Sequence, residues 1–270
     1  MLIDSFGRKI TYARISLTDR CNLNCRYCRD EAGVEIVSHS ELLRLEDIIS
    51  IIKKLVDKGI EKVRLTGGEP LLRKNVVYLV EQLAKIKNLK DISMTTNGIL
   101  LPKYAQSLHD AGLKRINISL DTLNAKKYRY ITRGGKLSDV LIGIKTSKKV
   151  GFKPIKINTV LINGFNDNEK EAIKQFCKEF GLISRFIKEM NLSKGIWSGV
   201  EGDGKNETGL CRKCNKIRIT CFGKILPCLF SDLSIDLKKI DFNDALKETL
   251  KIKPKQGNFN SSLSMKQIGG

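Results

Sequence analysis

Strand-like and helix-like segments alternate through the first two thirds of the chain, and this alternation constrains the fold more than any other feature. Six short apolar runs have the composition of β-strands: Tyr12–Leu17, Lys62–Thr66, Asp91–Thr96, Arg115–Leu120, Lys156–Leu161 and Ser184–Lys188. Five helical patterns lie between them, near Leu45–Lys58, Val76–Ile86, Pro102–Ala111, Ser138–Val150 and Asn168–Phe180. A repeated strand–helix order implies parallel strands joined by right-handed crossovers, and hence an α/β barrel or open sheet. Because six units fall short of a complete TIM barrel, we expect a partial (β/α)6 barrel.

The alternation stops near Met190. The stretch Asn191–Leu210 contains five glycines and few large apolar residues, which predicts a flexible linker. We therefore expect three parts: a partial barrel over residues 1–190, a linker over 191–210, and a C-terminal region over 211–270 that carries a second cysteine group and ends in Gly269-Gly270.

Three cysteines follow the first predicted strand, at Cys21, Cys25 and Cys28. Three thiolates in one short loop can hold a four-iron cluster and leave one iron open to another ligand, and an open position is typical of catalytic metal sites. A structural zinc site is the alternative, but zinc usually takes four ligands and no nearby histidine completes this set. The triplet therefore predicts a reactive iron–sulfur centre.

Polar residues also follow the next three predicted strands. Gly67-Gly68-Glu69-Pro70 comes after the second, Thr95-Thr96-Asn97-Gly98 ends the third, and Ser119-Leu120-Asp121 ends the fourth. In parallel α/β folds the carboxyl ends of the strands meet at one edge, where ligands bind. We therefore expect these residues and the cysteine triplet to form one site.

The composition restricts the classes of partner and the cellular location that we expect for this chain. Lys and Arg exceed Asp and Glu by 49 − 29 = 20, a surplus that attracts polyanions. The lysines are dispersed among acidic residues and aromatics make up only 6% of the chain, so a dedicated nucleic-acid surface is disfavoured. No apolar run approaches the roughly 18 residues needed to cross a membrane, and the N-terminus has no targeting pattern, so we expect a cytoplasmic protein. Eight cysteines in such a chain favour metal binding over disulfides.

The second cysteine group comprises Cys211, Cys214 and Cys228. Cys221 could add a fourth thiolate, which would make a closed zinc or iron–sulfur site, and the spacing alone leaves these alternatives open. Lys216 and Arg218 alternate on one face of a probable strand beside this group. Two such cations suit an anionic substrate.

The cysteine triplet and the Gly-Gly-Glu-Pro turn resemble those of the radical S-adenosylmethionine (SAM) enzymes, over positions 11 to about 190. The resemblance implies that SAM chelates the open iron through its amino and carboxylate groups and is cleaved to a 5′-deoxyadenosyl radical. It also implies that Tyr27 contacts the adenine, Gly68 the amino group, and Ser119 the ribose or methionyl end.

The second cysteine stretch, the starting segments Ile3–Arg8 and Arg14–Cys21, and the terminal Gly269-Gly270 resemble more narrowly the GTP 3′,8-cyclases (MoaA type) of molybdenum-cofactor biosynthesis. This resemblance implies a second [4Fe-4S] cluster on Cys211, Cys214 and Cys228, whose open iron binds guanine. It also implies that Met190 lies near SAM. The residues that it implies for substrate binding are Arg14, Arg64, Thr95, Lys156, Lys216 and Arg218. We expect Arg185, after the sixth strand, to be a further cation at the substrate. The glycine tail is expected to enter the active site.

The implied reaction converts GTP to 3′,8-cyclo-7,8-dihydro-GTP, with electrons from a reductant or electron-transfer protein. The next pathway enzyme, cyclic pyranopterin monophosphate synthase, is a candidate partner. Two other hypotheses stay open: a different radical SAM enzyme with an auxiliary cluster acting on a peptide or RNA, and a non-catalytic metal-binding module for nucleic acid. The chain departs from the family pattern in three ways: Lys216 stands where arginine is usual, the 191–210 connection is short, and the histidine that usually follows Lys253-Pro254 is absent, with Gly257 near that place.

Overall fold

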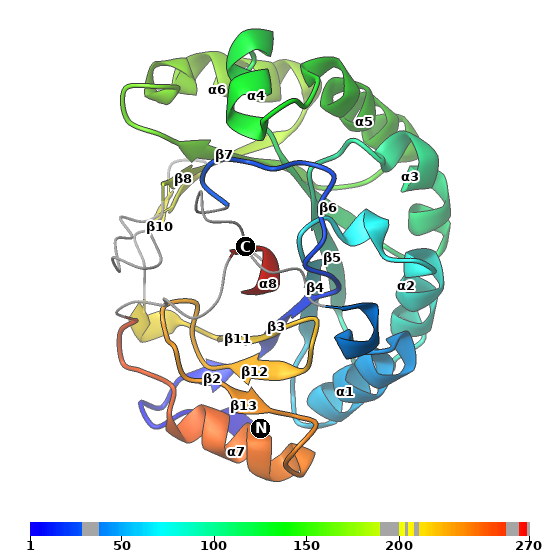
Figure 1. The fold of residues 1–270 in the computed structure, drawn as a ribbon, viewed down its shortest axis with the longest axis vertical. Coiled ribbons are helices and arrows are strands. Elements are labelled where there is room, and N and C mark those ends of the chain that lie inside the picture. The colour runs from blue at the N-terminus through cyan, green and yellow to red at the C-terminus, as the bar shows by residue number, and fades with distance from the viewer. Residues whose placement is uncertain (29–37, 190–199, 203–204, 208–210, 258–264, 269–270) are drawn as a thin grey trace.

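One eleven-stranded sheet forms the body of the protein in a computed structural model that describes residues 1–28, 38–189, 200–202, 205–207, 211–257 and 265–268. Its middle consists of six parallel strands in chain order: β3 (Tyr12–Ser16), β4 (Lys62–Thr66), β5 (Asp91–Thr96), β6 (Arg115–Ser119), β7 (Ile155–Leu161) and β8 (Ile183–Lys188). Figure 1 shows this sheet curving into an open arc. The expected partial α/β barrel is confirmed, with each expected strand boundary within one residue of the observed one.

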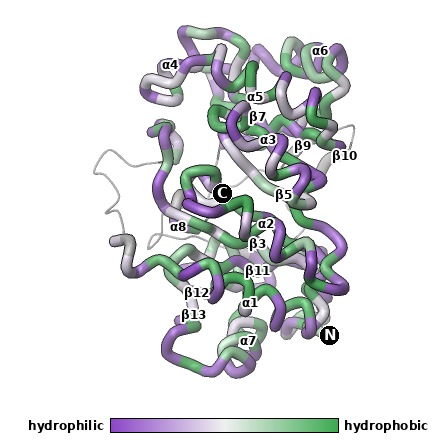
Figure 2. The backbone as a smooth tube through the Cα atoms, turned by 90° about the vertical axis from the view of Figure 1, so that its right-hand side faces the viewer, coloured by the Kyte–Doolittle hydropathy of each residue, from purple (hydrophilic) through white to green (hydrophobic). Residues whose placement is uncertain are grey.

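Helices cover the outer face of the arc (Figure 1). The five expected helices are α1 (Leu45–Asp57), α2 (Val76–Ala84), α3 (Leu101–Asp110), α5 (Leu137–Val150) and α6 (Lys170–Phe180). In Figure 2 the outer helices carry alternating hydrophilic and hydrophobic stretches, as amphipathic helices do. The sequence did not predict α4 (Ala125–Thr132), whose composition is largely polar. It begins at Asn124, whose side-chain oxygen accepts hydrogen bonds from the backbone N–H groups of Lys126 and Lys127.

Alternate residues of each barrel strand face opposite sides of the sheet, and this decides where the polar side chains lie. In β4, Val63 and Leu65 are completely buried in the core that the sheet forms with the helices. Arg64, between them, faces the concave side of the sheet, which we call the lumen. Strands covered on both faces are normally apolar throughout, so polar residues at alternate positions indicate a lumen that binds a polar ligand.

The C-terminal region joins the same sheet. Strand β11 (Lys216–Ile219) pairs in parallel with β3, and β12 (Lys224–Leu226) and β13 (Ile235–Asp236) follow antiparallel. At the other edge, β9 (Val200–Gly202) and β10 (Lys205–Glu207) extend the sheet from within the expected linker. The rest of that linker and Met190 lie outside the described residues, and the proposed division at 190 and 210 stays a prediction.

The remaining elements surround the ends of the chain. They are the N-terminal hairpin of β1 (Leu2–Ile3) and β2 (Lys9–Ile10), α7 (Phe242–Lys251), α8 (Met265–Ile268), and four 3-10 turns at His39–Glu41, Pro70–Leu72, Asp167–Glu169 and Cys211–Lys213. Helix α8 contacts β3 and lies inside the arc in Figure 1, with Ile268 fully buried. Gly269-Gly270 follow it and are not described. Within the described part of the chain, no helix combines the length and apolar character needed to span a bilayer.

Candidate functional site

The first cysteine loop follows β3 and packs directly on the Gly67-Gly68 turn that follows β4. The backbone N–H of Gly68 donates to the Thr18 carbonyl at 2.7 Å, and that of Glu69 donates to the Arg20 carbonyl at 2.7 Å. A Cβ atom at Gly68 would lie only 2.2 Å from the Arg20 carbonyl oxygen, and one at Gly67 2.5 Å from that of Thr18. Only glycine fits this approach, so the turn holds the loop that carries Cys21, Cys25 and Cys28.

Glu69 joins the end of β4 to the end of β5. Its carboxylate is completely buried and accepts hydrogen bonds from Leu71 N at 3.0 Å, Thr96 Oγ1 at 2.7 Å and Asn97 N at 2.8 Å. Burial raises the pKa of Glu69 to about 7, although these three hydrogen bonds oppose the shift. Asn97 Nδ2 reaches onward to Asn22 Oδ1 at 2.7 Å and to Cys21 Sγ at 3.8 Å.

Tyr27 joins the cysteine loop to the ends of β6 and β7. Its hydroxyl donates to Asp121 Oδ2 at 2.8 Å, while the N–H of Val160 donates to Asp121 Oδ1 at 2.8 Å. Burial raises the pKa of Asp121 to about 6, and burial together with the Asp121 charge raises the pKa of Tyr27 well above its usual value. Ser119 is the last residue of β6. Tyr27, Gly68 and Ser119 therefore all lie at the carboxyl edge of the sheet, whereas their contacts with SAM stay predictions.

Basic residues form a row across the lumen. Strand register places Arg218 of β11 beside Arg14 of β3, and Arg14 beside Arg64 of β4. Burial lowers the pKa of Arg14 well below its usual value, and the charge of Arg218 lowers it further. The pKa of Lys216 is lowered to about 8, because the surrounding protein partly desolvates its ammonium and Arg14 repels it, although the side chain keeps access to solvent. Cations this close favour a bound polyanion.

The neighbouring strands extend this basic surface. Thr95 of β5, Asn117 of β6 and Lys156 of β7 are in register, and Asn158 of β7 pairs with Arg185 of β8. Arg185 lowers the pKa of Arg14, after the larger effects of burial and Arg218, which shows that its charge reaches the row. The fold thus brings all seven expected substrate-binding residues to strands of one sheet.

Several buried polar atoms of the lumen make no hydrogen bond to any described residue. They are Tyr12 Oη, Thr95 Oγ1, Asn117 Nδ2 and Asn158 Oδ1. A buried polar group without a partner costs about 1–3 kcal/mol, so four of them on one concave surface indicate a polar ligand there. Only Thr95 was predicted from the sequence. The alternation of polar and apolar residues within β3, β6 and β7 would have identified the other three.

Tyr12 has a distinct position among the cations. Its ring centroid lies 5.6 Å from the guanidinium carbon of Arg64 and 5.9 Å from the ammonium of Lys216. Cation–π attraction at such distances orders both side chains. Tyr12 therefore positions two expected substrate-binding cations while its own hydroxyl stays available to a ligand.

The second cysteine group lies at the opposite end of the lumen from the first. Strands β3 and β11 are parallel, and Cys21 follows β3 whereas Cys214 precedes β11. Cys228 follows β12, which runs antiparallel and returns the chain to Cys214. Cys221 follows β11, is 1% exposed, and its pKa is raised to about 12 by burial and then by Asp19. Cys221 thus lies at the end of β11 that is remote from Cys214, and it is not placed to supply a fourth thiolate. The second cysteine group therefore offers three thiolates.

The comparisons with known proteins agree with this arrangement. Residues 15–177 match the model of the Radical SAM superfamily. A GTP 3′,8-cyclase of Thermodesulfovibrio yellowstonii is 38% identical over 93% of this chain and 94% of its own, and one of Peptoclostridium acidaminophilum is 40% identical over 100% and 98%. The crystal structure of Streptococcus suis SuiB bound to S-adenosylmethionine superposes with a TM-score of 0.69 at 18% identity, over 87% of this chain and 65% of that protein.

The chain belongs to the GTP 3′,8-cyclase family of the radical SAM superfamily. It is also shorter than its relatives. The alignment with the Peptoclostridium cyclase extends over 320 positions although this chain has 270 residues, so at least 320 − 270 = 50 positions of the alignment have no residue in this chain.

Radical SAM enzymes bind a four-iron cluster and SAM, and the first cysteine loop fits them. Its three thiolates are half-buried, the half-buried Gly67-Gly68 turn packs against the loop that carries them, and a cavity of about 490 Å³ is lined by Cys21, Asn24 and residues at and after the end of α4. No three His, Cys, Asp or Glu side chains of the described residues converge on one metal-ion position. A four-iron cluster does not require this, because each thiolate binds a different iron. The second group offers the same donor set.

Proposed function

We propose that this protein converts GTP to 3′,8-cyclo-7,8-dihydro-GTP, using SAM and an electron donor, in molybdenum-cofactor biosynthesis. The family membership supports the activity. The observation that carries the assignment to these residues is the row of basic side chains between two incomplete cysteine groups. A radical centre at one end and a cluster at the other would meet a nucleotide held between them.

The carboxyl edge of the sheet would bind SAM. With a cluster on Cys21, Cys25 and Cys28, SAM bound there would supply a 5′-deoxyadenosyl radical, the reactive species that the reaction requires. Around it, the backbone of Gly68 would accommodate the methionyl amino group, Ser119 the ribose or methionyl end, and Tyr27 the adenine. Met190 is proposed near the cofactor on the family pattern alone. The protein contributes orientation and exclusion of water.

The lumen would bind the triphosphate and sugar of GTP. GTP carries several negative charges, and each charge-assisted hydrogen bond to it adds about 1.5–3 kcal/mol. We assign this role to Arg14, Arg64, Lys156, Arg185, Lys216 and Arg218, with Thr95 nearby. Asn117 and Asn158 add an amide N–H and an amide oxygen without partners among the described residues, and these could read hydroxyl or base edges.

The amino end of β11 would carry the second cluster, on Cys211, Cys214 and Cys228. Its open iron is proposed to contact the guanine, which would orient C8 toward the ribose. Residues 211–270 would then act as the auxiliary-cluster region, 1–190 as the radical SAM barrel and 191–210 as their connection. An electron-transfer protein is the proposed donor, cyclic pyranopterin monophosphate synthase the proposed recipient of product, and the cytoplasm the proposed location.

An anaerobic assay tests this function. The reconstituted protein is incubated with SAM, dithionite and either GTP, ATP or no nucleotide, and 5′-deoxyadenosine and the cyclised nucleotide are quantified. We expect both products in near-equal amounts with GTP and only slow deoxyadenosine formation otherwise. Deoxyadenosine formation that is the same with and without GTP would refute the assignment.

The other hypotheses have distinct signatures. A peptide- or RNA-modifying radical enzyme would still cleave SAM but would not respond to GTP. A non-catalytic nucleic-acid module would hold zinc, or would fail to cleave SAM at all. No feature of the described residues favours either of them over the cyclase.

A further inference from the structure

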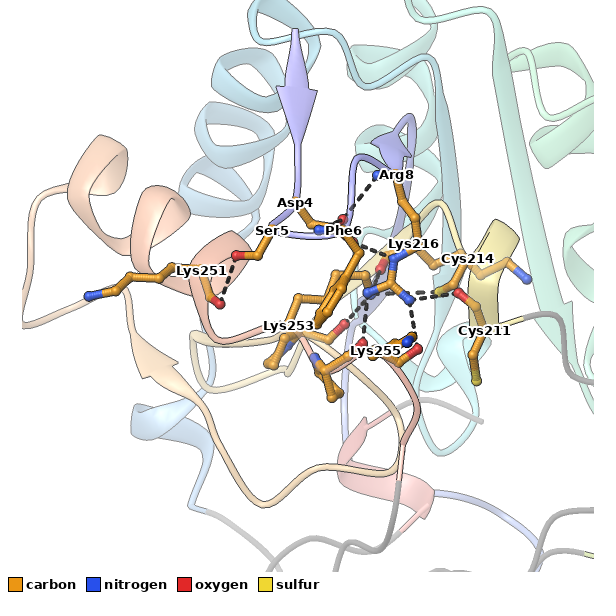
Figure 3. Close-up of polar contacts among 12 residues, drawn as sticks. Asp4, Ser5, Phe6, Arg8, Cys211, Cys214, Lys216, Lys251, Lys253 and Lys255 are labelled. Carbon is orange, nitrogen blue, oxygen red and sulfur yellow. Dashed lines mark hydrogen bonds and ion pairs between the residues drawn. The ribbon is translucent and has the colours of Figure 1, made fainter.

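The ammonium group of Lys253 is buried against the second cysteine group. Lys253 is 2% exposed, and its Nζ donates to Cys214 Sγ at 3.6 Å, to the Lys216 carbonyl at 2.8 Å and to the Pro227 carbonyl. Figure 3 shows these contacts converging between Cys214 and the C-terminal segment. A lysine has three donors, so all are used. Pro227 directly precedes Cys228, and the single ammonium therefore fixes the chain at two of the three thiolates.

The same segment reaches the other cysteines. Arg8, buried and paired with Asp4 at 2.6 Å, donates to the Cys211 carbonyl at 2.6 Å and to the Pro254 carbonyl at 2.7 Å (Figure 3). Farther on, a Cβ at Gly257 would lie 2.9 Å from Cys228 Sγ. Residues 253–257, which we call the strap, thus contact each member of the second cysteine group directly or through Arg8.

The charge of Lys253 is not balanced by a described carboxylate. Arg8 has Asp4, but no Asp or Glu of the described residues forms an ion pair with Lys253. Burying an ammonium among a sulfur and two carbonyls is unfavourable unless an anion is near. The neighbouring group that can supply negative charge is the set of thiolates, and a cluster bound to three of them would be anionic.

We propose that Lys253 is a positioning residue that tunes the second cluster: its ammonium compensates the negative charge of the cluster through Cys214, and so raises the reduction potential of that cluster. This inference rests on the proposed second cluster. A cation beside a cluster stabilises the more negative, reduced form, and hydrogen bonds to ligand sulfurs act in the same direction. The strap then couples the electronic properties of the cluster to the C-terminal segment.

The test uses the reconstituted full-length protein and three variants, K253M, K253R and K251M. Lys251 is the matched control, because its side chain is 75% exposed and contacts Glu248 rather than a cysteine. Iron per chain is measured first, and the midpoint potential of each cluster is then determined by redox titration with electron paramagnetic resonance. To resolve the second cluster, the titration is repeated in a background lacking Cys21, Cys25 and Cys28.

For K253M we expect either a second cluster with a lower midpoint potential or loss of about half of the iron. For K253R we expect the iron content and the potential to stay close to those of the wild type, since the charge is retained. K251M should be unchanged. An unchanged potential in K253M at full iron content would overturn the proposal, and so would equal defects in K253M and K253R, because then shape rather than charge matters. If the wild type itself holds only one cluster, the proposed function fails instead.

Discussion

The two cysteine-bearing ends of the lumen are built in different ways. At the carboxyl edge, the loop with Cys21 is held by backbone hydrogen bonds to Gly68 and Glu69 and by the Tyr27–Asp121 pair. At the amino end, the loop with Cys211 and Cys214 is held by two buried cations, Arg8 and Lys253. The first end is thus organised by close backbone packing and carboxylates, the second by positive charge.

The difference follows from what each end would bind. SAM is a sulfonium cation with its own amino and carboxylate groups, so the first end needs exposed backbone and space beside the iron. Both ends would bind an anionic cluster, but at the first end the sulfonium and amino group of SAM would lie beside it, whereas at the second end the cations that compensate the cluster charge come from the protein. Changes of shape should therefore be most harmful at the first end, and changes of charge at the second and in the lumen.

The largest expected effect is that of Gly68→Ala. Because the new Cβ would meet the Arg20 carbonyl at 2.2 Å, the cysteine loop must move. We expect loss of the first cluster, seen as loss of about half of the iron and of SAM cleavage, with the second cluster retained. Gly164→Ala is the control for backbone strain without a clash, since its φ of +70° disfavours alanine although nothing lies within 4 Å of its Cβ position. Loss of both clusters would break the comparison, because the two ends would then not be independent.

Charge reversal in the lumen ranks second. Arg218→Glu replaces a buried cation of the row by an anion, and we expect GTP binding to weaken by about 100-fold or more, on the order of 3 kcal/mol. SAM binding should be nearly unaffected. Lys239→Glu, at an exposed site, makes the same change in net charge. Calorimetric titration with each ligand separates the two effects, and a parallel loss of SAM affinity would point to misfolding.

Glu69→Gln tests the carboxylate of the first end. One of the three groups that donate to Glu69 would face an amide N–H₂, so we expect the unfolding free energy to fall by about 1–3 kcal/mol. The pKa of Glu69 is raised from 4.5 to about 7, so the folded protein binds more protons and its stability decreases as pH rises across that interval. Urea denaturation at several pH values should show this slope in the wild type and not in the variant. Equal slopes in the wild type and the variant would show that Glu69 does not cause this pH dependence of stability.

Tyr12→Phe removes one unpartnered hydroxyl and keeps the ring between Arg64 and Lys216. We expect GTP affinity to fall about threefold to tenfold, the value of one hydrogen bond, with stability unchanged or slightly higher. Tyr12→Leu, which also removes the ring, should weaken binding further. Equal affinities for the wild type and Tyr12→Phe would show that the hydroxyl does not meet the substrate.

The smallest effect concerns Lys216. Its pKa is lowered from 10.5 to about 8, so its ammonium loses the proton as pH rises through that value, and GTP affinity should decline by a few-fold over the same interval. Lys216→Arg should abolish this decline, because arginine stays protonated. Equilibrium binding between pH 7 and 9.5 measures the difference, and identical profiles would exclude Lys216 from the anion site.

The sequence by itself determined the parts whose signals are local. Period-two and helical patterns located six strands and five helices, and cysteine spacing with the Gly67-Gly68 turn indicated the first site. It did not indicate α4, a largely polar helix that begins at the Asn124 cap. Nor did it place Tyr12, Asn117 or Asn158 in the site, although each occupies a lumen-facing position of its strand.

Only the tertiary structure decided what depends on pairing between distant segments. Whether residue 216 lies beside residue 12 depends on β11 joining β3 in parallel, and that pairing sets the two cysteine groups at opposite ends of one lumen. Lys253 belongs to a lysine-rich segment whose composition predicts exposure to solvent, yet it is buried against Cys214. The local sequence around a residue specifies the backbone geometry there, whereas the burial of the side chain and its charged neighbours arise from contacts across the whole chain.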